Sequence, residues 1–250
     1  MSIHDLYKIP YNNARCIYDA SEMYSPDELG GDCIYIAQKT KACIEQEGYT
    51  SKIVSQDKAG PRVHFANLVT DTQGSRYFFD PRFGMVNPAP LPTSTRKVTQ
   101  VGVAPNSLSS KTNSCKSSKL TIKYNSTNSI TVDLYSRLTS NYISMNYDFT
   151  SIKDIPTPIQ LSQFFMRSLH ITAISPWDNG LYKLNFDMHS QKFYLFRTHG
   201  LSSNPQGKIY PGNKEFDHLK EYFSSAFTLE FNDILEYLQV ARSTLQKIKS

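Results

Sequence analysis

The chain has 250 residues, of which 39% are hydrophobic, and carries a formal net charge of +5. This is enough apolar material for a full core in one compact unit or in about two or three small subdomains. The sequence has no apolar run near eighteen residues and no charged-then-apolar leader, which argues against a membrane span and against secretion. Its four cysteines are irregularly spaced and form neither a disulfide framework nor a zinc pattern. We therefore expect a cytoplasmic protein with reduced thiols and no metal.

The first block, residues 1 to about 57, is predicted to be mainly helical. A turn at 26–32 leads into a helix over 33–47, with Asp32 as a natural N-cap and Gly48 as the stop. The inward face repeats at spacings of three and four residues, through Cys33, Ala37, Thr40 and Ile44. Unpaired backbone N–H groups and the helix dipole favour a thiolate in the first helical turn, where Cys33 falls. We interpret the preceding glycines, Gly30 and Gly31, as room for a substrate beside the thiol.

The second block, residues 58–149, is rich in predicted strands and begins with a hairpin. His64 lies in one strand, 71–74 form a turn, and 75–80 return as a strand that ends at Asp80. A histidine and an aspartate on adjacent antiparallel strands can be cross-strand neighbours. Asp80 could also serve as a structural cap for the turn at Pro81 and Arg82. Further strands are predicted at 119–124, 129–134 and 142–149, and 107–118 as a low-complexity loop.

The third block, residues 150–250, mixes helix and strand. We predict a helix at 158–169, a hairpin of 181–186 with 192–197, and an amphipathic terminal helix at 232–248. The predicted inward residues of the last helix are Ile234, Leu235, Leu238, Ala241 and Leu245.

Cysteine, histidine and aspartate in this order match a thiol nucleophile, its base and the orienter of that base. A thiol is mostly protonated at neutral pH and needs a nearby imidazole to hold it as thiolate. A carboxylate in turn selects the imidazole tautomer and stabilises its charged form. We assign these roles to Cys33, His64 and Asp80. The other cysteines and histidines are interpreted as structural.

The motifs around these residues resemble those of the arylamine N-acetyltransferase family. Gly30-Gly31-Asp32-Cys33 is similar to the family's Arg-Gly-Gly-x-Cys, and 63–69 to its histidine strand. The segment 80–84 resembles Asp-Val-Gly-Phe-Gly, the segment 88–92 the proline-leucine stretch after it, and 9–13 Val-Pro-Phe-Glu-Asn. His64 follows Cys33 by 31 residues and Asp80 follows His64 by 16, which are family-like gaps. The clear match covers about the first ninety residues.

Two motif positions depart from the family pattern. Leu29 stands where the family has arginine, and Tyr35 where it has an acidic or amide residue two positions after the cysteine. If these positions form a polar pair in relatives, both members are replaced here together, which is less damaging than the loss of one. Only some thirty residues precede Cys33, so relative to the family we expect a short N-terminal helical bundle.

The resemblance implies an α/β (α+β) fold with a papain-like core. It comprises an N-terminal helical segment with Cys33 (1–57), a central antiparallel β-barrel or sheet with His64 and Asp80 (58–149), and a C-terminal α/β lid (150–250). The implied activity is acyltransfer from acetyl-CoA or another acyl-CoA to an amine through acyl-Cys33. Arg82, Phe83 and Gly84 are the implied coenzyme A-binding residues.

Two other classes share this triad and stay open. Cysteine peptidases and transglutaminase-like enzymes acylate the cysteine from an amide, and an inactive relative would only bind. The acceptor could be a small-molecule amine or a peptide; we expect neither a nucleic acid nor a membrane as partner.

Between Asp80 and Asp133 there is no acidic residue, while seven basic residues occur: Arg82, Arg96, Lys97, Lys111, Lys116, Lys119 and Lys123. Such a surface would attract a polyanion, for which the phosphates of coenzyme A are the first candidate and nucleic acid the second, or it is an ordinary solvated lysine face.

Overall fold

The structure is a computed structural model that describes residues 2–57, 63–102, 119–136, 141–150, 168–174, 181–198 and 209–249. The chain divides into two compact units, each built from separate stretches of sequence. Unit 1 comprises 1–8, 33–155 and 200–202, and unit 2 comprises 9–32, 156–199 and 203–250. The mixed helix-and-sheet class expected from the sequence is confirmed, with helices and antiparallel sheets in both units.

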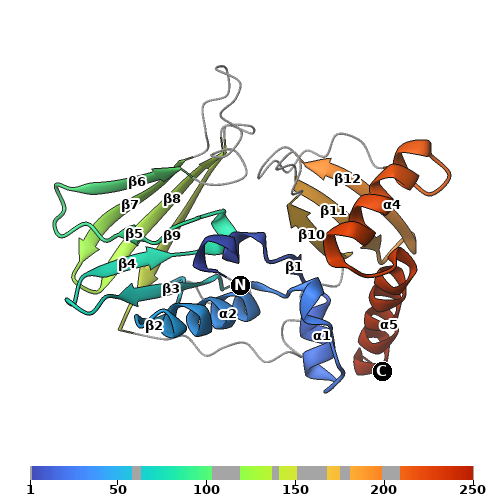
Figure 1. The fold of residues 1–250 in the computed structure, drawn as a ribbon, viewed down its shortest axis with the longest axis horizontal. Helices are drawn as coiled ribbons and strands as arrows, with labels where there is room; N and C mark the ends of the chain where they lie inside the picture. Colours follow the sequence, from blue (N-terminus) through green and yellow to red (C-terminus); the bar gives the residue numbers. More distant parts are fainter. Residues whose placement is uncertain are drawn as a thin grey trace. The chain divides into compact units, whose positions relative to one another are not determined.

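Unit 1 contains two four-stranded antiparallel sheets and one long helix (Figure 1). Helix α2 (Cys33–Gln46) packs against the first two strands of the order β2-β3-β4-β5. The strands of this sheet are β2 (Thr50–Ser55), β3 (Phe65–Thr70), β4 (Arg76–Phe79) and β5 (Ala89–Pro90). The second sheet has β6 (Val98–Gly102), β7 (Lys119–Ser126), β8 (Ser129–Ser136) and β9 (Asn141–Asp148). The 3-10 turns η1 (Ile3–Lys8) and η3 (Pro81–Phe83) complete the unit.

The two sheets of unit 1 meet at two edges. Gln56, just after β2, forms an antiparallel bridge with Tyr147 of β9. At the other edge the Thr99 hydroxyl of β6 donates to the Pro90 carbonyl of β5 at 2.7 Å. Among the described strands the ladder does not close, so the central element is a pair of sheets rather than a closed barrel.

The predicted elements of unit 1 are largely present. The helix starts at Cys33, and its buried side includes Ala37, Thr40 and Ile44 as expected. β3 and β4 form the predicted hairpin. Strand β2 was not expected, because 50–55 belong to a block predicted to be mainly helical. Strand β3 is covered on both faces, since all of its residues but the last are buried.

Unit 2 combines helices with a third four-stranded antiparallel sheet, whose strands lie in the order β1-β10-β11-β12. Its strands are β1 (Tyr11–Asn12), β10 (Ser168–Ile174), β11 (Leu181–Asp187) and β12 (Lys192–Thr198). The helices among its described residues are α1 (Arg15–Ala20), the turn η2 (Asp27–Leu29), α4 (Lys214–Phe227) and α5 (Phe231–Lys249). The hairpin β11–β12 and the terminal helix α5 agree with the sequence. Most of the predicted helix at 158–169 lies outside the described residues, and its last two residues begin β10.

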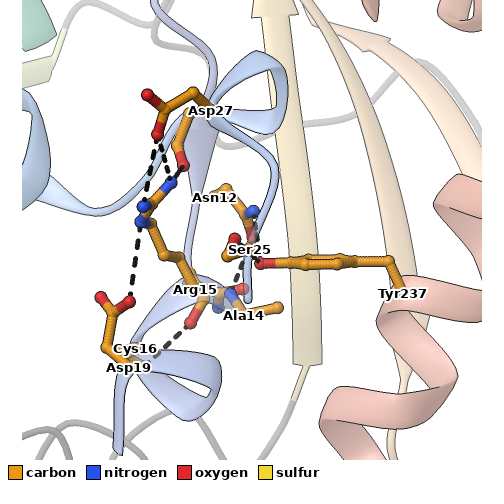
Figure 2. A network of polar contacts seen from close by, with 10 residues as sticks. Asn12, Ala14, Arg15, Cys16, Asp19, Ser25, Asp27 and Tyr237 are labelled. Carbon is orange, nitrogen blue, oxygen red and sulfur yellow. Dashed lines mark hydrogen bonds and ion pairs between the residues drawn. The ribbon is translucent and has the colours of Figure 1, made fainter. Parts of the chain in front are cut away.

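A buried polar network ties the start of unit 2 to its C-terminal helix (Figure 2). The Tyr237 hydroxyl of α5 accepts from Asn12 Nδ2 at 3.0 Å and shares a hydrogen bond with Ser25 Oγ at 2.8 Å. The Tyr18 ring stacks on the Tyr237 ring with the ring centroids 4.1 Å apart. The Tyr18 hydroxyl donates a hydrogen bond to the backbone carbonyl oxygen of Tyr237 at 2.9 Å. Residues 12–25 are therefore held to α5 by directional bonds as well as by apolar packing.

No helix among the described residues is long and apolar enough to cross a membrane.

Candidate active site

Cys33 is the first residue of α2, and its side chain is half-buried. Its Sγ lies 3.8 Å from the carbonyl oxygen of Val63, the residue before His64. The start of the helix is thus packed against the backbone that carries the histidine.

His64 precedes β3, and its backbone is held to the end of β2. Its carbonyl oxygen accepts the N–H of Gln56 at 2.8 Å. The imidazole is covered on one side by the ring of Phe83, whose centroid lies 4.8 Å away with the planes tilted by 24°. The His64 side chain is 17% exposed, so one edge of the imidazole ring remains accessible.

Asp80 is almost fully buried and binds two partners with its two oxygens. Oδ2 lies 2.6 Å from His64 Nε2, and Oδ1 accepts the backbone N–H of Arg82 at 2.9 Å. One carboxylate therefore makes both contacts that the sequence interpretations of Asp80 require, one to His64 and one to the following turn. With Nε2 directed to Asp80, the other ring nitrogen, Nδ1, is the one available to a thiol.

The charge state of His64 follows from these neighbours. Burial alone would lower the pKa of His64, but the charge of Asp80, its hydrogen bond to the ring and the Cys33 thiol outweigh burial and raise the pKa to about 10. At neutral pH the imidazole is thus protonated and can stabilise a thiolate. The arrangement can supply a nucleophile, a proton carrier and a fixed carboxylate in one place.

Tyr147 of β9 is a neighbour of the triad for which the sequence carries no signal. Burial, and then the charges of Asp80 and Cys33, raise the pKa of the Tyr147 hydroxyl well above its ordinary value, so the phenol is neutral. The ring packs edge-on against Phe78 at 5.1 Å, and its hydroxyl donates to Met145 Sδ at 3.8 Å. Because Tyr147 belongs to a different sheet from His64 and Asp80, only the folded chain brings the three together.

Gly30, the first glycine of the motif that contains Cys33, has a packing role that the sequence interpretation missed. Gly30 has a φ of +65°, and a Cβ there would lie 1.9 Å from the carbonyl oxygen of Pro10. The adjacent Gly31 N–H donates to the same oxygen at 3.2 Å. We therefore correct the interpretation of Gly30 as room for a substrate: its missing side chain admits the backbone of residue 10.

Arg15 binds the turn that precedes the motif (Figure 2). Its Nη1 donates to the Gly30 carbonyl at 3.1 Å, and the guanidinium also contacts Asp27 at 3.5 Å and Asp19 at 3.8 Å. Leu29, where the family has arginine, is buried with 1% exposure. The guanidinium at this turn thus comes from α1 rather than from residue 29.

The predicted coenzyme A-binding residues follow Asp80 directly. Arg82 is half-buried, Phe83 is buried against His64, and Gly84 ends η3 in the left-handed conformation with φ of 74°. Among the other basic residues, Lys123 is paired with Asp133 at 2.6 Å, while Lys111 and Lys116 lie outside the described residues. Of this basic stretch, Arg82 stands nearest the triad along the chain.

A pocket of about 700 Å³ lies elsewhere in unit 1. It is lined at the turn end of the β3–β4 hairpin by Ser2, Ile3, Glu47, Tyr49, Val69, Asp71, Thr72, Gln73, Tyr77 and Pro88. None of the triad residues lines it, so the pocket and the triad occupy opposite ends of the hairpin.

The fold and the site together define an α+β protein with a cysteine, a histidine and a buried aspartate in one constellation. Two solved structures share this fold. The chain is similar to an M. smegmatis arylamine N-acetyl transferase with a TM-score of 0.54 and 12% identity, over 97% of this chain and 91% of that chain. It is similar to Mycobacterium marinum arylamine N-acetyltransferase in complex with CoA with a TM-score of 0.57 and 14% identity, over 98% and 91% of the two chains.

These likenesses confirm the fold that the motif resemblance implied, and they extend it from the first ninety residues to almost the whole chain. No protein-family model matches the sequence, and no curated protein matches it.

Proposed function

We propose that the protein is an acyltransferase that moves an acetyl or other short acyl group from an acyl-CoA to an amine through an acyl-Cys33 intermediate. The observation that carries the proposal is the 2.6 Å contact between His64 and the buried Asp80, with the Cys33 thiol acting on the same imidazole. The fold it shares with arylamine N-acetyltransferases, one of them solved with CoA, favours a thioester as acyl donor over an amide.

In the first half-reaction the Cys33 thiolate attacks the thioester carbonyl. Backbone N–H groups at the start of α2, including that of Cys33, stabilise the oxyanion. The C–S bond to coenzyme A then breaks, and the protonated His64 donates its proton to the leaving thiolate. The products are acyl-Cys33, neutral His64 and free coenzyme A.

In the second half-reaction the amine attacks acyl-Cys33. His64 accepts the amine proton, the bond between the acyl carbon and Cys33 Sγ breaks, and the thiolate–imidazolium pair is restored. Asp80 keeps Nε2 occupied throughout, so that Nδ1 serves the thiol and the amine.

For coenzyme A binding we propose the segment of Arg82, Phe83 and Gly84. The Arg82 guanidinium offers a positive charge for a phosphate next to the triad, and the left-handed Gly84 lets the backbone turn close to a ligand. Phe83 contributes mainly through the face it packs on His64. We expect Arg82→Ala to raise KM for acetyl-CoA more than it lowers kcat.

We propose that the reaction takes place in the cytoplasm, because Cys33 must stay reduced to act.

Intact-mass spectrometry after incubation with acetyl-CoA tests the proposal. We expect one added acetyl group in the parent and none in Cys33→Ala. Cys43→Ala is the matched control on the same helix: Cys43 is buried, burial raises the pKa of its thiol, and this variant should still be acetylated. If no short acyl-CoA gives an adduct, the assignment of an acyl-CoA as the acyl donor is wrong. An adduct formed only from amide substrates would support the peptidase or transglutaminase-like alternative.

A further inference from the structure

Asn67 is a polar residue in the middle of β3 at a fully buried position. Asn67 is 0% exposed, and its backbone pairs with Ile53 of β2 on one side and with Phe79 of β4 on the other. The flanking residues of the strand, Ala66 and Leu68, are apolar and buried as well.

The amide of Asn67 binds two other elements at once. Nδ2 donates to the carbonyl oxygen of Ala37 on α2 at 3.0 Å and to Ser51 Oγ on β2 at 3.1 Å. One side chain therefore connects the helix of Cys33 to two strands of the sheet.

The Asn67 amide leaves a buried oxygen without a hydrogen bond within the described part of the chain, which lowers the stability of the core. Asn67 Oδ1 has no hydrogen-bond partner among the residues that the structure describes, and neither has Thr40 Oγ1 on the facing helix. Both residues are 0% exposed, so these atoms are desolvated without compensation. A leucine at position 67 would avoid that cost, so core stability alone does not account for the asparagine.

The position of Asn67 relative to the triad suggests what the amide does. Ala37 lies one helical turn after Cys33 and on the same helix face. Asn67 follows His64 by three residues, and its pairing partner Phe79 directly precedes Asp80. Apolar contacts allow a helix to slide on a sheet, whereas a hydrogen bond of defined geometry holds one registration.

We propose that Asn67 is a positioning residue that holds α2 against β3 in the registration that places Cys33 Sγ next to His64. The inference rests on the proposed function, because it assumes that the thiol is activated by His64. Among the described residues, His64 and Tyr147 interact electrostatically with Cys33, and Asp80 binds His64. None of them is altered in the test.

The test measures the alkylation rate of Cys33 by iodoacetamide from pH 5 to 9, read from the mass of the Cys33 peptide, together with the melting temperature. Asn67→Leu removes both hydrogen bonds and keeps a side chain with the same number of heavy atoms and the same branching at Cγ. Val69→Ala is the control for general loss of packing on the same strand, and Ser51→Ala removes only the acceptor on β2.

In the parent, a thiolate held by His64 should be alkylated rapidly at pH 6. We expect Asn67→Leu to react about tenfold more slowly at pH 6 and within about twofold of the parent at pH 9, where most thiols are ionised without help. Val69→Ala and Ser51→Ala should keep the parent profile even if they melt earlier. If Asn67→Leu does not fold, Asn67→Ser, whose hydroxyl is too short to bridge α2 and β2, is judged by the same criteria.

A parent profile in the Asn67 variant, or an equal change in Val69→Ala, would overturn the positioning role while leaving acyl-Cys33 formation intact. A parent that is alkylated slowly at pH 6 and takes no acetyl group would overturn the proposed function, and this inference with it.

Discussion

The two ends of the β3–β4 hairpin each carry an aspartate in nearly the same local arrangement. At the turn end, Asp71 Oδ1 accepts the N–H groups of Gln73 and Ser75, and Oδ2 accepts the Tyr77 hydroxyl at 3.1 Å. At the other end, Asp80 Oδ1 accepts the Arg82 N–H, and Oδ2 binds His64. In each case one oxygen caps a turn and the other binds an aromatic side chain.

The environments of the two carboxylates differ. Asp80 is 1% exposed and faces a base, whereas Asp71 lies at a solvent-facing turn and faces a phenol. What little burial Asp71 has would raise its pKa, but the N–H groups of Ser75 and Gln73 and the Tyr77 hydroxyl hold the pKa of Asp71 below its ordinary value. The same local motif thus caps a turn at both ends of the hairpin, and at the Asp80 end it also stabilises a charged imidazole. The difference comes from burial and from the chemistry of the aromatic partner.

The largest expected effect separates the two aspartates by activity. Asp80→Asn should keep the turn cap, because the amide oxygen still accepts the Arg82 N–H, but it leaves His64 in the wrong tautomer. In a serine protease the equivalent change costs on the order of 10⁴ in turnover. Asp71→Asn should leave acetyl transfer within about twofold of the parent. Steady-state turnover of both variants checks this, and a comparable loss in both would contradict the assignment of Asp80 to the triad.

A pH titration of stability tests the protonated His64. Its pKa in the folded state, about 10, is raised above the ordinary 6.5, so the stabilisation is fully present below pH 6.5 and declines as the pH rises toward 10. At its steepest the decline is about 1.4 kcal/mol per pH unit. Denaturant unfolding of Cys33→Ala and of Cys33→Ala/His64→Gln should differ by this slope, because the thiol that exchanges a proton with His64 is absent from both variants. Parallel curves between pH 6.5 and 10 would show that His64 is not protonated there.

The Phe83 ring should contribute a smaller effect through its contact with the imidazole. A stacked aromatic pair contributes about 1 kcal/mol, so Phe83→Leu should lower stability by about that amount. If the same contact orients the ring during turnover, kcat should fall about fivefold. Phe78→Leu, in the preceding strand β4 and packed on Tyr147, is the control for loss of an aromatic core residue. Equal losses of kcat in both variants would assign Phe83 to the core alone.

The smallest effect concerns the caps themselves. Asp80→Ala removes the acceptor of the Arg82 N–H that Asp80→Asn retains, and it should be about 1 kcal/mol less stable than Asp80→Asn. Asp71→Ala should lower the melting temperature slightly relative to Asp71→Asn for the same reason. Equal stability of the Ala and Asn variants at either end would show that the cap contributes nothing there.

Much of the candidate site could be predicted because its signals are local. The helix beginning at Cys33 follows from a turn, an apolar repeat and a stop, and the hairpin follows from two strands around a short polar turn. The division of the sequence into three consecutive blocks stays a prediction; the two units that the structure defines are each assembled from separate stretches, and residues 9–32 and 33–57 of the first block belong to different units. Local patterns carry no information about which distant segments will pack together.

The sequence by itself determined the order and spacing of Cys33, His64 and Asp80, the helix start at the cysteine and the hairpin that presents the other two. Only the tertiary structure decided that Asp80 is buried against His64, that Tyr147 enters from another sheet, and that Gly30 admits Pro10. It also placed Asn67 between α2 and β2. The physical reason is that charge state and hydrogen bonding depend on which groups exclude water from one another, and in this chain those groups come from segments far apart in sequence.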